Sequence, residues 1–262
     1  MIGQKNIKDW VDKVSNNFPH FIVLIGESGS GKRTVCKYIS NYLSLVYSEC
    51  EIRTEAVREV IDTAYKSTTK VMYNFCNADN MKVQAKNALL KITEEPPENA
   101  YFCLTLNDDT SLLDTIRSRA CVIYLEWYTL NDIEECCSKK SADKELNKLV
   151  CDIATVPGDI DKLLEYGKDF YDYSKLVVDN IAEVEPANAF KSASKLAIKS
   201  DEGYDLKLFW KVILYWCNQH LQDKWFEAAL VTCRYLNKVD NAGVNKQQLY
   251  DMWVLDIRSV LI

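Results

Sequence analysis

The sequence has no long hydrophobic run, because no apolar stretch approaches the roughly 18 residues that a membrane-spanning helix needs. Its start, residues 1–9, is polar and lacks the apolar core of a secretory signal peptide. A basic excess is missing as well, since the formal net charge is −6. This charge argues against a general nucleic-acid or anionic-membrane surface, although it allows a local basic patch. We therefore expect a cytoplasmic protein without a membrane partner.

Paired cysteines are also missing. The chain contains ten cysteines, but no two have the C-x-x-C spacing that is common in zinc and redox sites. Several lie in or beside apolar runs, where a free thiol behaves as a small hydrophobic group; they are Cys36, Cys76, Cys103 and Cys121. The pattern predicts unpaired thiols in a reducing compartment and no metal site.

Histidine is scarce, with His20 and His220 as its only occurrences. Neither lies in a catalytic or metal-ligand motif, so a packing role is the simpler interpretation for both. Of the 262 residues 48% are hydrophobic. That is enough for a real core, spread over one large domain or two to three small ones.

Residues 26–32 form a recognisable local motif, GESGSGK. They follow residues 21–25 (FIVLI), a continuous apolar run that is typical of a strand buried on both faces. Lys32 would reach the terminal phosphates of a nucleotide. The loop glycines would let backbone N–H groups turn toward phosphate, with the following helix adding its positive end; they are Gly26, Gly29 and Gly31. The motif therefore predicts a site for ATP or ADP.

The next two residues depart from that motif. The usual loop has Ser or Thr after the lysine, and its hydroxyl binds Mg²⁺, but this chain has Arg33 there and Thr34 one place later. A shift of one residue turns a helical side chain by about 100°, so Thr34 cannot simply replace the missing hydroxyl. Two interpretations remain open. The loop is either a degenerate site that still binds nucleotide, with Thr34 facing the α-phosphate, or a vestige.

A helix is predicted from about Asn80 to Glu95, because apolar residues recur at steps of three and four; they are Met81, Ala85, Ala88, Leu89 and Ile92. Pro96 ends the helix, since its ring clashes with the preceding turn. Glu94 and Glu95 then lie where the helix dipole disfavours a carboxylate, by roughly 0.3–1 kcal/mol each. A purely structural helix would not place two acids there.

Further elements are predicted from pattern alone. A helix begins near Thr54, which is a plausible cap. Residues 110–116 read as another helix and residues 121–125 as a buried strand. After residue 129 the pattern is helical, and four tryptophans across residues 210–253 suit either a core or an interface.

Apolar runs flank the central helix at residues 71–75 and 101–106. Residues 87–97 read NALLKITEEPP, and the second apolar run is followed by Ser118-Arg119-Ala120. Together these motifs resemble the core of clamp-loader subunits of the AAA+ class, the group of delta-prime, gamma/tau and replication factor C. In that family a strand leads into an NALLK…EEPP helix, a second strand and a Ser-Arg-Cys motif.

The resemblance implies an α/β fold in three parts. An AAA+ P-loop domain with a parallel sheet would occupy residues 1–128, a small helical lid residues 129–170, and an all-helical collar residues 171–262. Some bacterial members of the family carry a four-cysteine zinc module. That module is absent, because Cys50 is the only cysteine in residues 40–70, and we expect no zinc.

The chain departs from the hydrolysing members of the family at the acidic motif. Those members carry Asp-Glu at the end of the first flanking strand, and the corresponding residues are Cys76 and Asn77. A thiol and an amide cannot replace a metal-binding carboxylate and a general base. Asp79 is the nearest substitute, but it lies past the strand end. Asp161 stands where the family has an arginine that contacts nucleotide, and a carboxylate there repels phosphate.

Two further residues acquire roles through the resemblance. Asn107 matches the polar residue that reads the γ-phosphate. Arg119 matches the arginine that reaches across a subunit interface into a neighbour's ATP site, where its fixed charge stabilises the transferred phosphoryl group. The alternative for Arg119 is a surface side chain in a local salt bridge.

These features predict a non-hydrolysing clamp-loader subunit of the delta-prime type, a component of a DNA polymerase holoenzyme with no ATPase activity of its own. It would work with other clamp-loader subunits, the sliding clamp and primed DNA, and lend Arg119 to a neighbour. Two alternatives stay open. One is an active P-loop ATPase that uses Thr34 and Asp79, and the other is a stand-alone nucleotide-binding regulator.

Overall fold

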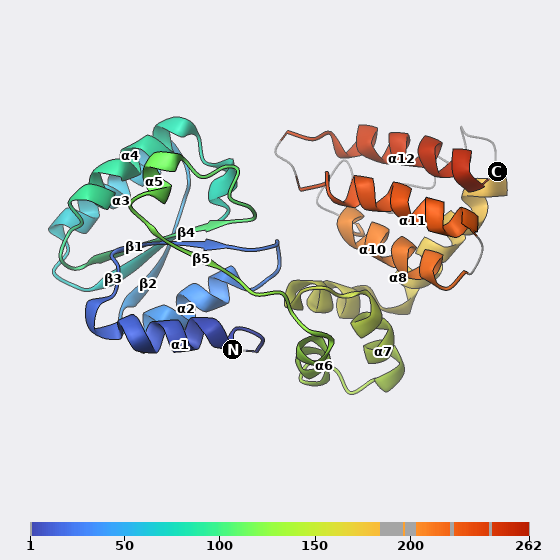
Figure 1. Cartoon of the computed structure of the whole chain (residues 1–262), viewed down its shortest axis with the longest axis horizontal. Helices are drawn as coiled ribbons and strands as arrows, with labels where there is room; N and C mark the ends of the chain where they lie inside the picture. The colour runs from blue at the N-terminus through green and yellow to red at the C-terminus, as the bar shows by residue number, and fades with distance from the viewer. Residues whose placement is uncertain (1, 184–195, 197–202, 221–222, 241–242, 262) are drawn as a thin grey trace. The chain divides into compact units, whose positions relative to one another are not determined.

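The computed structural model describes residues 2–183, 196, 203–220, 223–240 and 243–261. The chain divides into two compact units, Met1–Asp132 and Ile133–Ile262, each of which is described by itself (Figure 1). Within the described ranges no helix is both long and apolar enough to cross a membrane.

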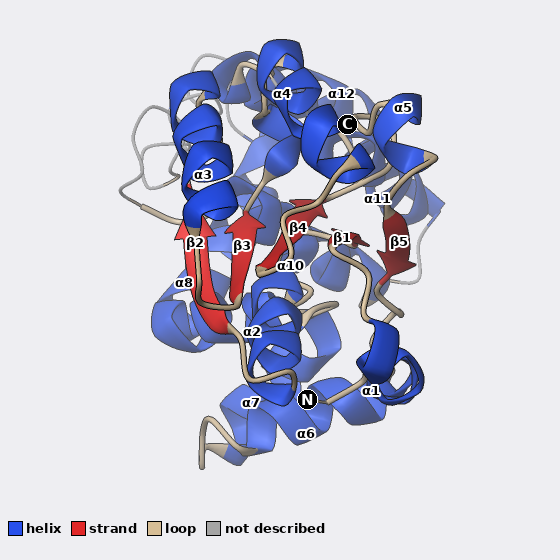
Figure 2. Ribbon diagram, turned by 90° about the vertical axis from the view of Figure 1, so that its left-hand side faces the viewer, coloured by secondary structure: helices blue, strands red, loops and turns tan. Residues whose placement is uncertain are grey.

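The first unit is built on a five-stranded sheet whose strands are all parallel. The strands follow the order β2-β3-β4-β1-β5 across the sheet, as Figure 2 shows. This arrangement confirms the predicted α/β fold. The strand bounds are β1 Phe21–Ile25, β2 Val46–Cys50, β3 Val71–Phe75, β4 Ala100–Leu106 and β5 Cys121–Tyr124.

Helices cover both faces of this sheet (Figure 1). On one face α1 (Lys5–Val14) and α2 (Lys32–Tyr42) enclose a core that includes Ile22 and Leu24. On the other face lie α3 (Thr54–Lys66), α4 (Val83–Glu94) and α5 (Asp114–Arg117), over a core that includes Val23. The two cores explain why β1 is a continuous apolar run, since its alternate side chains are buried on opposite faces.

Two predicted helix starts are wrong. The central helix begins at Val83, because Asn80 ends a 3₁₀ turn and Met81 and Lys82 are extended, with ψ of 129° and 151°. Met81 still packs into the core, which is why its apolar spacing looked helical. Thr54 is the first helical residue of α3 and not its cap, since the capping position is Arg53 and no side chain caps it.

Two later elements also differ from the prediction. The expected helix at residues 110–116 shrinks to α5, because Asp108 Oδ1 accepts hydrogen bonds from the Thr110 backbone N–H (2.8 Å) and hydroxyl and holds a turn there. The strand expected at residues 121–125 is present as β5, but its side chains are half-buried or exposed. β5 lies at the edge of the sheet, with β1 as its one neighbouring strand, and this edge position explains the exposure.

The described residues of the second unit form helices joined by turns, with one isolated β-bridge between Leu196 and Tyr204. Helix α8 contacts α7, α10 and α12, and helix α11 contacts both α10 and α12. A kink at Gly167 (φ 60°, ψ −161°) bends α8 three residues before residue 170, the predicted end of the lid. The separation of lid from collar stays a prediction. The bounds are α6 Leu130–Ser138, α7 Lys144–Ile153, α8 Pro157–Glu183, α10 Leu206–Asn218, α11 Asp223–Leu236 and α12 Lys246–Leu261.

Aromatic side chains fill the centre of this unit. Trp210 and Trp253 are fully buried with ring centroids 6.2 Å apart, and Trp253 Nε1 donates to Thr232 Oγ1 (3.1 Å). These two tryptophans therefore serve the core. Trp216 and Trp225 are only half-buried, so of the four tryptophans in residues 210–253 these two could still serve an interface.

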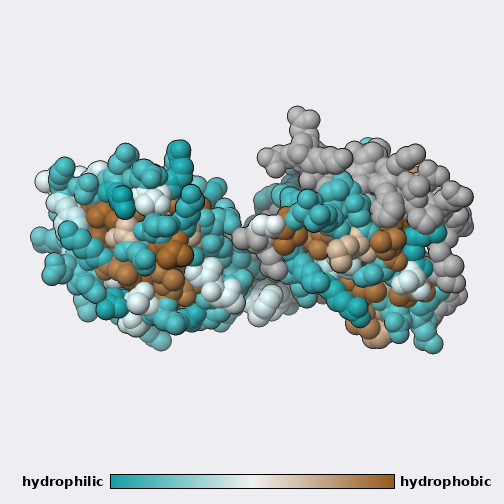
Figure 3. All heavy atoms as spheres, turned by 90° about the horizontal axis from the view of Figure 1, so that it is seen from above, coloured by the Kyte–Doolittle hydropathy of each residue, from teal (hydrophilic) through white to brown (hydrophobic). Residues whose placement is uncertain are grey.

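Both units also expose apolar side chains among polar ones, as the view in Figure 3 shows. In the second unit Phe226 and Leu230 are exposed one turn apart on α11, and Met252 and Leu255 are exposed on α12, which packs against α11. Contiguous patches of exposed apolar side chains mark contact surfaces, whereas apolar residues exposed singly are normal.

Candidate functional site

The glycine-rich loop joins β1 to α2, as predicted. Gly29 and Gly31 adopt left-handed backbone conformations, with φ of 86° and 87°, which residues with a Cβ atom rarely adopt. At Gly26 a Cβ atom would lie 3.0 Å from both Ser30 Oγ and Leu125 Cβ. The loop thus depends on glycine at all three positions.

Lys32 and Asn107 meet at the mouth of this loop. The Lys32 ammonium donates to the backbone oxygens of Gly26 and Glu27 (2.9 Å to the latter) and to Asn107 Oδ1 (3.2 Å). Asn107 directly follows β4, which lies beside β1 in the sheet. Lys32 and Asn107, the residue predicted to contact the γ-phosphate, therefore lie together at the carboxyl ends of the central strands. Parallel sheets usually bind ligands at these ends.

Arg33 and Thr34 occupy the first turn of α2. The Arg33 guanidinium lies 2.7 Å from Glu49 Oε1 on β2, and it also interacts with the Cys76 thiol just after β3, an interaction that raises the pKa of Arg33. Thr34 is exposed at the next helical position. Arg33, which replaces the metal-binding hydroxyl residue, is therefore near enough to Cys76, which replaces the metal-binding carboxylate residue, for Cys76 to raise the pKa of Arg33.

The end of β3 offers hydrogen-bond donors where a metal site needs oxygen ligands. Asn74 Nδ2 donates to Cys76 Sγ (3.2 Å), and burial raises the pKa of the Cys76 thiol, which therefore stays protonated at neutral pH. Asn77 is exposed with φ of 53°, and its backbone N–H donates to Thr105 Oγ1 (3.1 Å). Mg²⁺ requires hard oxygen ligands in near-octahedral order, so these residues do not fit it.

Asp79 has a different task from the one an active ATPase would give it. Its carboxylate accepts the backbone N–H of Asn107 at 2.9 and 3.1 Å and the Ser111 hydroxyl at 3.3 Å. The Lys86 ammonium extends this network by donating to the Ser111 carbonyl oxygen (2.6 Å). Asp79 thus holds the backbone of Asn107 in place beside the loop lysine.

The substitution Asp79→Ala is expected to lower the free energy of unfolding of the first unit by about 1–3 kcal/mol, because it leaves the Asn107 N–H without its acceptor. Urea unfolding measures the change. Asp108→Ala is the matched control, since it removes an exposed turn carboxylate two residues from the same strand end. Equal losses in the two variants would show that Asp79 does not support the loop.

Arg119 lies beyond α5, in a local salt bridge. Its Nη2 is 3.0 Å from Glu94 Oε1 at the end of α4, and its Nη1 donates to the Thr115 carbonyl oxygen (2.9 Å). The Arg119 side chain is nevertheless 39% exposed. Its neighbour Arg117 turns to Asp109 of its own chain (3.2 Å). The pair with Arg119 also gives Glu94 a favourable partner at the helix end where a carboxylate is otherwise disfavoured.

Gln4 and Tyr128 close the loop from the side. Gln4, fully buried, donates to the Glu126 carbonyl oxygen (2.9 Å) and accepts the Glu126 N–H (3.0 Å), although 122 residues separate them. Tyr128 donates its hydroxyl to the Ser30 carbonyl oxygen (2.8 Å). The segment after β5 is thereby fastened to the glycine-rich loop.

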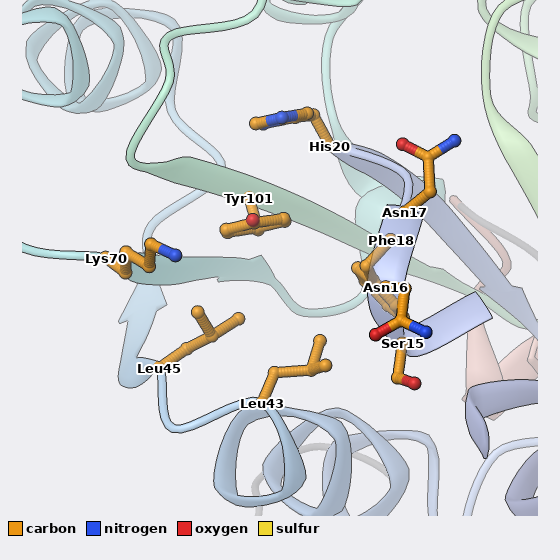
Figure 4. Close-up of a pocket in the computed structure, with 9 residues that line it drawn as sticks. All are labelled: Ser15, Asn16, Asn17, Phe18, His20, Leu43, Leu45, Lys70 and Tyr101. Atoms are coloured by element: carbon orange, nitrogen blue, oxygen red, sulfur yellow. The ribbon is translucent and has the colours of Figure 1, made fainter.

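A separate cavity of about 240 Å³ opens at the opposite, amino ends of the strands. Its wall includes His20, Lys70 and Tyr101, and the His20 and Tyr101 rings stack with centroids 4.7 Å apart (Figure 4). His20 Nδ1 also bonds to the Ala100 carbonyl oxygen (2.8 Å). None of the predicted site residues lines this cavity, and His20 has the packing role expected for it.

The cysteines hold no further site. All ten fall within the described residues and are unpaired. Over the same part of the chain, no cluster of three or more His, Cys, Asp and Glu side chains has the geometry to hold a metal ion.

Comparison with known proteins shows which families part of this chain is similar to. A family model described as DNA polymerase III, delta subunit, matches residues 45–128, which contain β2 to β5 and Arg119. Over 28% of the chain the sequence is 42% identical to DNA polymerase III subunit delta' of Yersinia pestis, and over 51% it is 29% identical to subunit gamma of Buchnera aphidicola. This part of the chain is therefore similar to the clamp-loader subunits of DNA polymerase III.

The chain spans less than half the length of the curated relatives it matches, 46% of the Buchnera protein and 23% of the Yersinia protein. A gamma-subunit-related protein of Thermotoga maritima has the same fold, with a TM-score of 0.53 at 16% identity over 97% of this chain and 99% of that chain. The RuvB branch migration motor of Thermotoga maritima reaches a TM-score of 0.53 at 17% identity, over 82% and 75% of the two chains. These likenesses confirm the AAA+ fold with its helical C-terminal part.

Proposed function

We propose that the chain is a delta-prime-type clamp-loader subunit that does not hydrolyse ATP and lends Arg119 to the ATP site of a neighbouring subunit. The observation that carries the proposal is that Arg33 and Cys76 occupy the two positions where an active site would hold Mg²⁺, with the Arg33 guanidinium paired to Glu49 at 2.7 Å. Without those ligands, phosphoryl transfer loses both its metal and the charge the metal supplies. A role in another subunit's reaction then gives the retained Arg119 a purpose.

The surroundings of Arg119 suit an exchange of partners. Its pair with Glu94 is exposed, with side-chain exposures of 39% and 57%, and exposed ion pairs are worth only about 0–1 kcal/mol. A phosphate presented by a neighbour would therefore compete easily with Glu94. The guanidinium is planar and permanently charged, so it can form two parallel hydrogen bonds to the phosphoryl oxygens as negative charge develops there.

The chain's own loop, in this proposal, binds ATP or ADP without turning it over. Lys32 and Asn107 lie together at the loop mouth, and Ser30 Oγ is buried without a hydrogen-bond partner in the described structure. Gly29 and Gly31 already have the left-handed conformations that direct backbone N–H groups toward an anion. These features fit a phosphate group, whereas the residues around Cys76 do not fit a metal.

The isolated protein is expected to show no magnesium-dependent ATP turnover above that of the variant Lys32→Ala. The reason is the absence of a metal carboxylate and a water-activating acid at Cys76 and Asn77. A coupled phosphate-release assay measures this. Turnover by the wild-type protein that disappears in Lys32→Ala would contradict the proposal and favour the alternative of an active ATPase based on Thr34 and Asp79.

Partners follow from the same proposal: other clamp-loader subunits, the sliding clamp and primed DNA. The exposed apolar side chains of α11 and α12 support assembly with other subunits. Co-elution with the clamp-loader ATPase of the same organism in size-exclusion chromatography is the expected result. A protein that elutes alone in every mixture would instead be a stand-alone nucleotide-binding regulator.

A further inference from the structure

We propose that the Arg33 guanidinium takes the place of the divalent cation at the glycine-rich loop, so that this chain binds the phosphates of ADP or ATP without magnesium. The inference rests on the proposal that the loop binds nucleotide, and it adds the chemistry of that binding. It is independent of Arg119 and of any partner subunit.

The position of Arg33 is the first support. It follows Lys32 directly at the start of α2, and its side chain points to two other elements, Glu49 on β2 at 2.7 Å and Cys76 after β3. In a metal-dependent loop, the residue after the lysine and the residue after this strand converge on one cation. In this chain those two positions are Arg33 and Cys76, and the positive charge is the Arg33 guanidinium instead of a metal ion.

The hydrogen-bond donors nearby are the second support. Asn74, fully buried, directs Nδ2 at Cys76 Sγ (3.2 Å), and Arg33 pairs with Glu49, which lies opposite Asn74 in the sheet. A metal ion there would face N–H groups and a neutral thiol, and the nearby Glu49 carboxylate, an oxygen ligand of the kind that Mg²⁺ prefers, is already paired with Arg33 at 2.7 Å. It would also lie beside a permanent positive charge, which repels it.

The loop supplies the remaining contacts for phosphate. The Lys32 ammonium is at its mouth, the buried Ser30 Oγ lacks a partner, and an arginine fork matches phosphate oxygens in planar pairs. Glu49 works against the anion, because its carboxylate both occupies the guanidinium and repels phosphate. The ligand must therefore displace Glu49 or share Arg33 with it, so removing the Glu49 charge should strengthen binding.

The test is calorimetric titration of the full chain with ADP, once in excess magnesium and once in excess EDTA. We expect dissociation constants that agree within about threefold in the two buffers. Arg33→Gln should weaken binding in EDTA by about tenfold or more, and Glu49→Gln should tighten it by about threefold, because the guanidinium is released. The double variant Arg33→Thr with Cys76→Asp restores two oxygen ligands and should bind ADP more tightly in magnesium than in EDTA.

Three results would overturn the inference. ADP binding that appears only with magnesium would show that Arg33 does not replace the cation, but it would leave the nucleotide-binding proposal intact. No binding in either buffer would contradict both. Unchanged affinity in Arg33→Gln would show that the guanidinium does not reach the phosphates. Arg33 is 56% exposed, so its variants should fold, and their thermal unfolding compared with the wild-type protein checks this directly.

Discussion

Replacing Arg119 by alanine is expected to lower ATP hydrolysis at the neighbouring subunit's site by about a thousandfold, the lower range for an arginine that acts in trans. The loss should appear in kcat and not in the affinity for ATP, because the guanidinium acts on charge that develops during transfer. The measurement is DNA-stimulated ATP turnover of the complex assembled from this chain and its organism's clamp-loader ATPase.

The matched control for that experiment is Arg117→Ala. Arg117 is two residues away and carries the same charge, but it donates to the Asp109 carboxylate and carbonyl oxygen of its own chain. Turnover should therefore stay within about twofold of wild type. Assembly of both variants is checked by size-exclusion chromatography. Equal turnover in Arg119→Ala and wild-type complexes would remove the arginine-finger role and leave Arg119 as the partner of Glu94.

The second large effect is expected in the helical unit, where Lys211 and Asp159 form a buried ion pair. Their side chains are only 5% and 9% exposed, and Lys211 Nζ lies 2.6 Å from Asp159 Oδ2. The same oxygen accepts the backbone N–H of Thr155 (3.0 Å), two residues before α8 begins. Lys211→Ala should lower the free energy of unfolding of this unit by about 3–5 kcal/mol, because it leaves a buried carboxylate without its counter-charge.

Urea unfolding followed by tryptophan fluorescence measures this loss, since Trp210 and Trp253 are buried in the same unit. Lys139→Ala is the control. Lys139 pairs with Glu135 one turn away at the surface, with side-chain exposures of 61% and 54%, and such pairs contribute about 0.3–0.5 kcal/mol. Similar losses in both variants would mean that Asp159 is solvated when Lys211 is absent.

The strands were predictable because burial on both faces leaves a direct mark on the sequence. β1 and β3 have the predicted bounds, since continuous apolar runs are rare outside a covered parallel sheet. Helix starts were less predictable. Met81 is apolar and helically spaced, yet it packs into the core from an extended backbone, and apolar spacing alone cannot distinguish these conformations.

The candidate site was predictable where it is local in the chain. The glycine-rich loop and Lys32 are contiguous, so their geometry follows from the motif. The cluster of Arg33, Glu49 and Cys76 was not predictable, because it joins α2, β2 and β3. Its formation depends on the register between β2 and β3, in which Glu49 lies opposite Asn74, and nothing local in the sequence sets that register.

The acidic end of α4 is an intermediate case. Helix-dipole reasoning marked Glu94 as misplaced for stability alone, but its partner lies 25 positions away at Arg119. The sequence therefore indicated that the Glu94 carboxylate has a role, but its partner, Arg119, is seen only in the structure. Glu95 differs, because its backbone carbonyl oxygen accepts the Tyr65 hydroxyl (2.9 Å) while its side chain is exposed.

The most direct test is a structure of the complex assembled with the clamp-loader ATPase and a non-hydrolysable ATP analogue. We expect the Arg119 guanidinium to lie within hydrogen-bonding distance of the γ-phosphate held by the neighbouring subunit, with its bond to Glu94 broken. A structure in which Arg119 remains on Glu94, while the γ-phosphate in the neighbouring site is contacted by other residues only, would contradict the account.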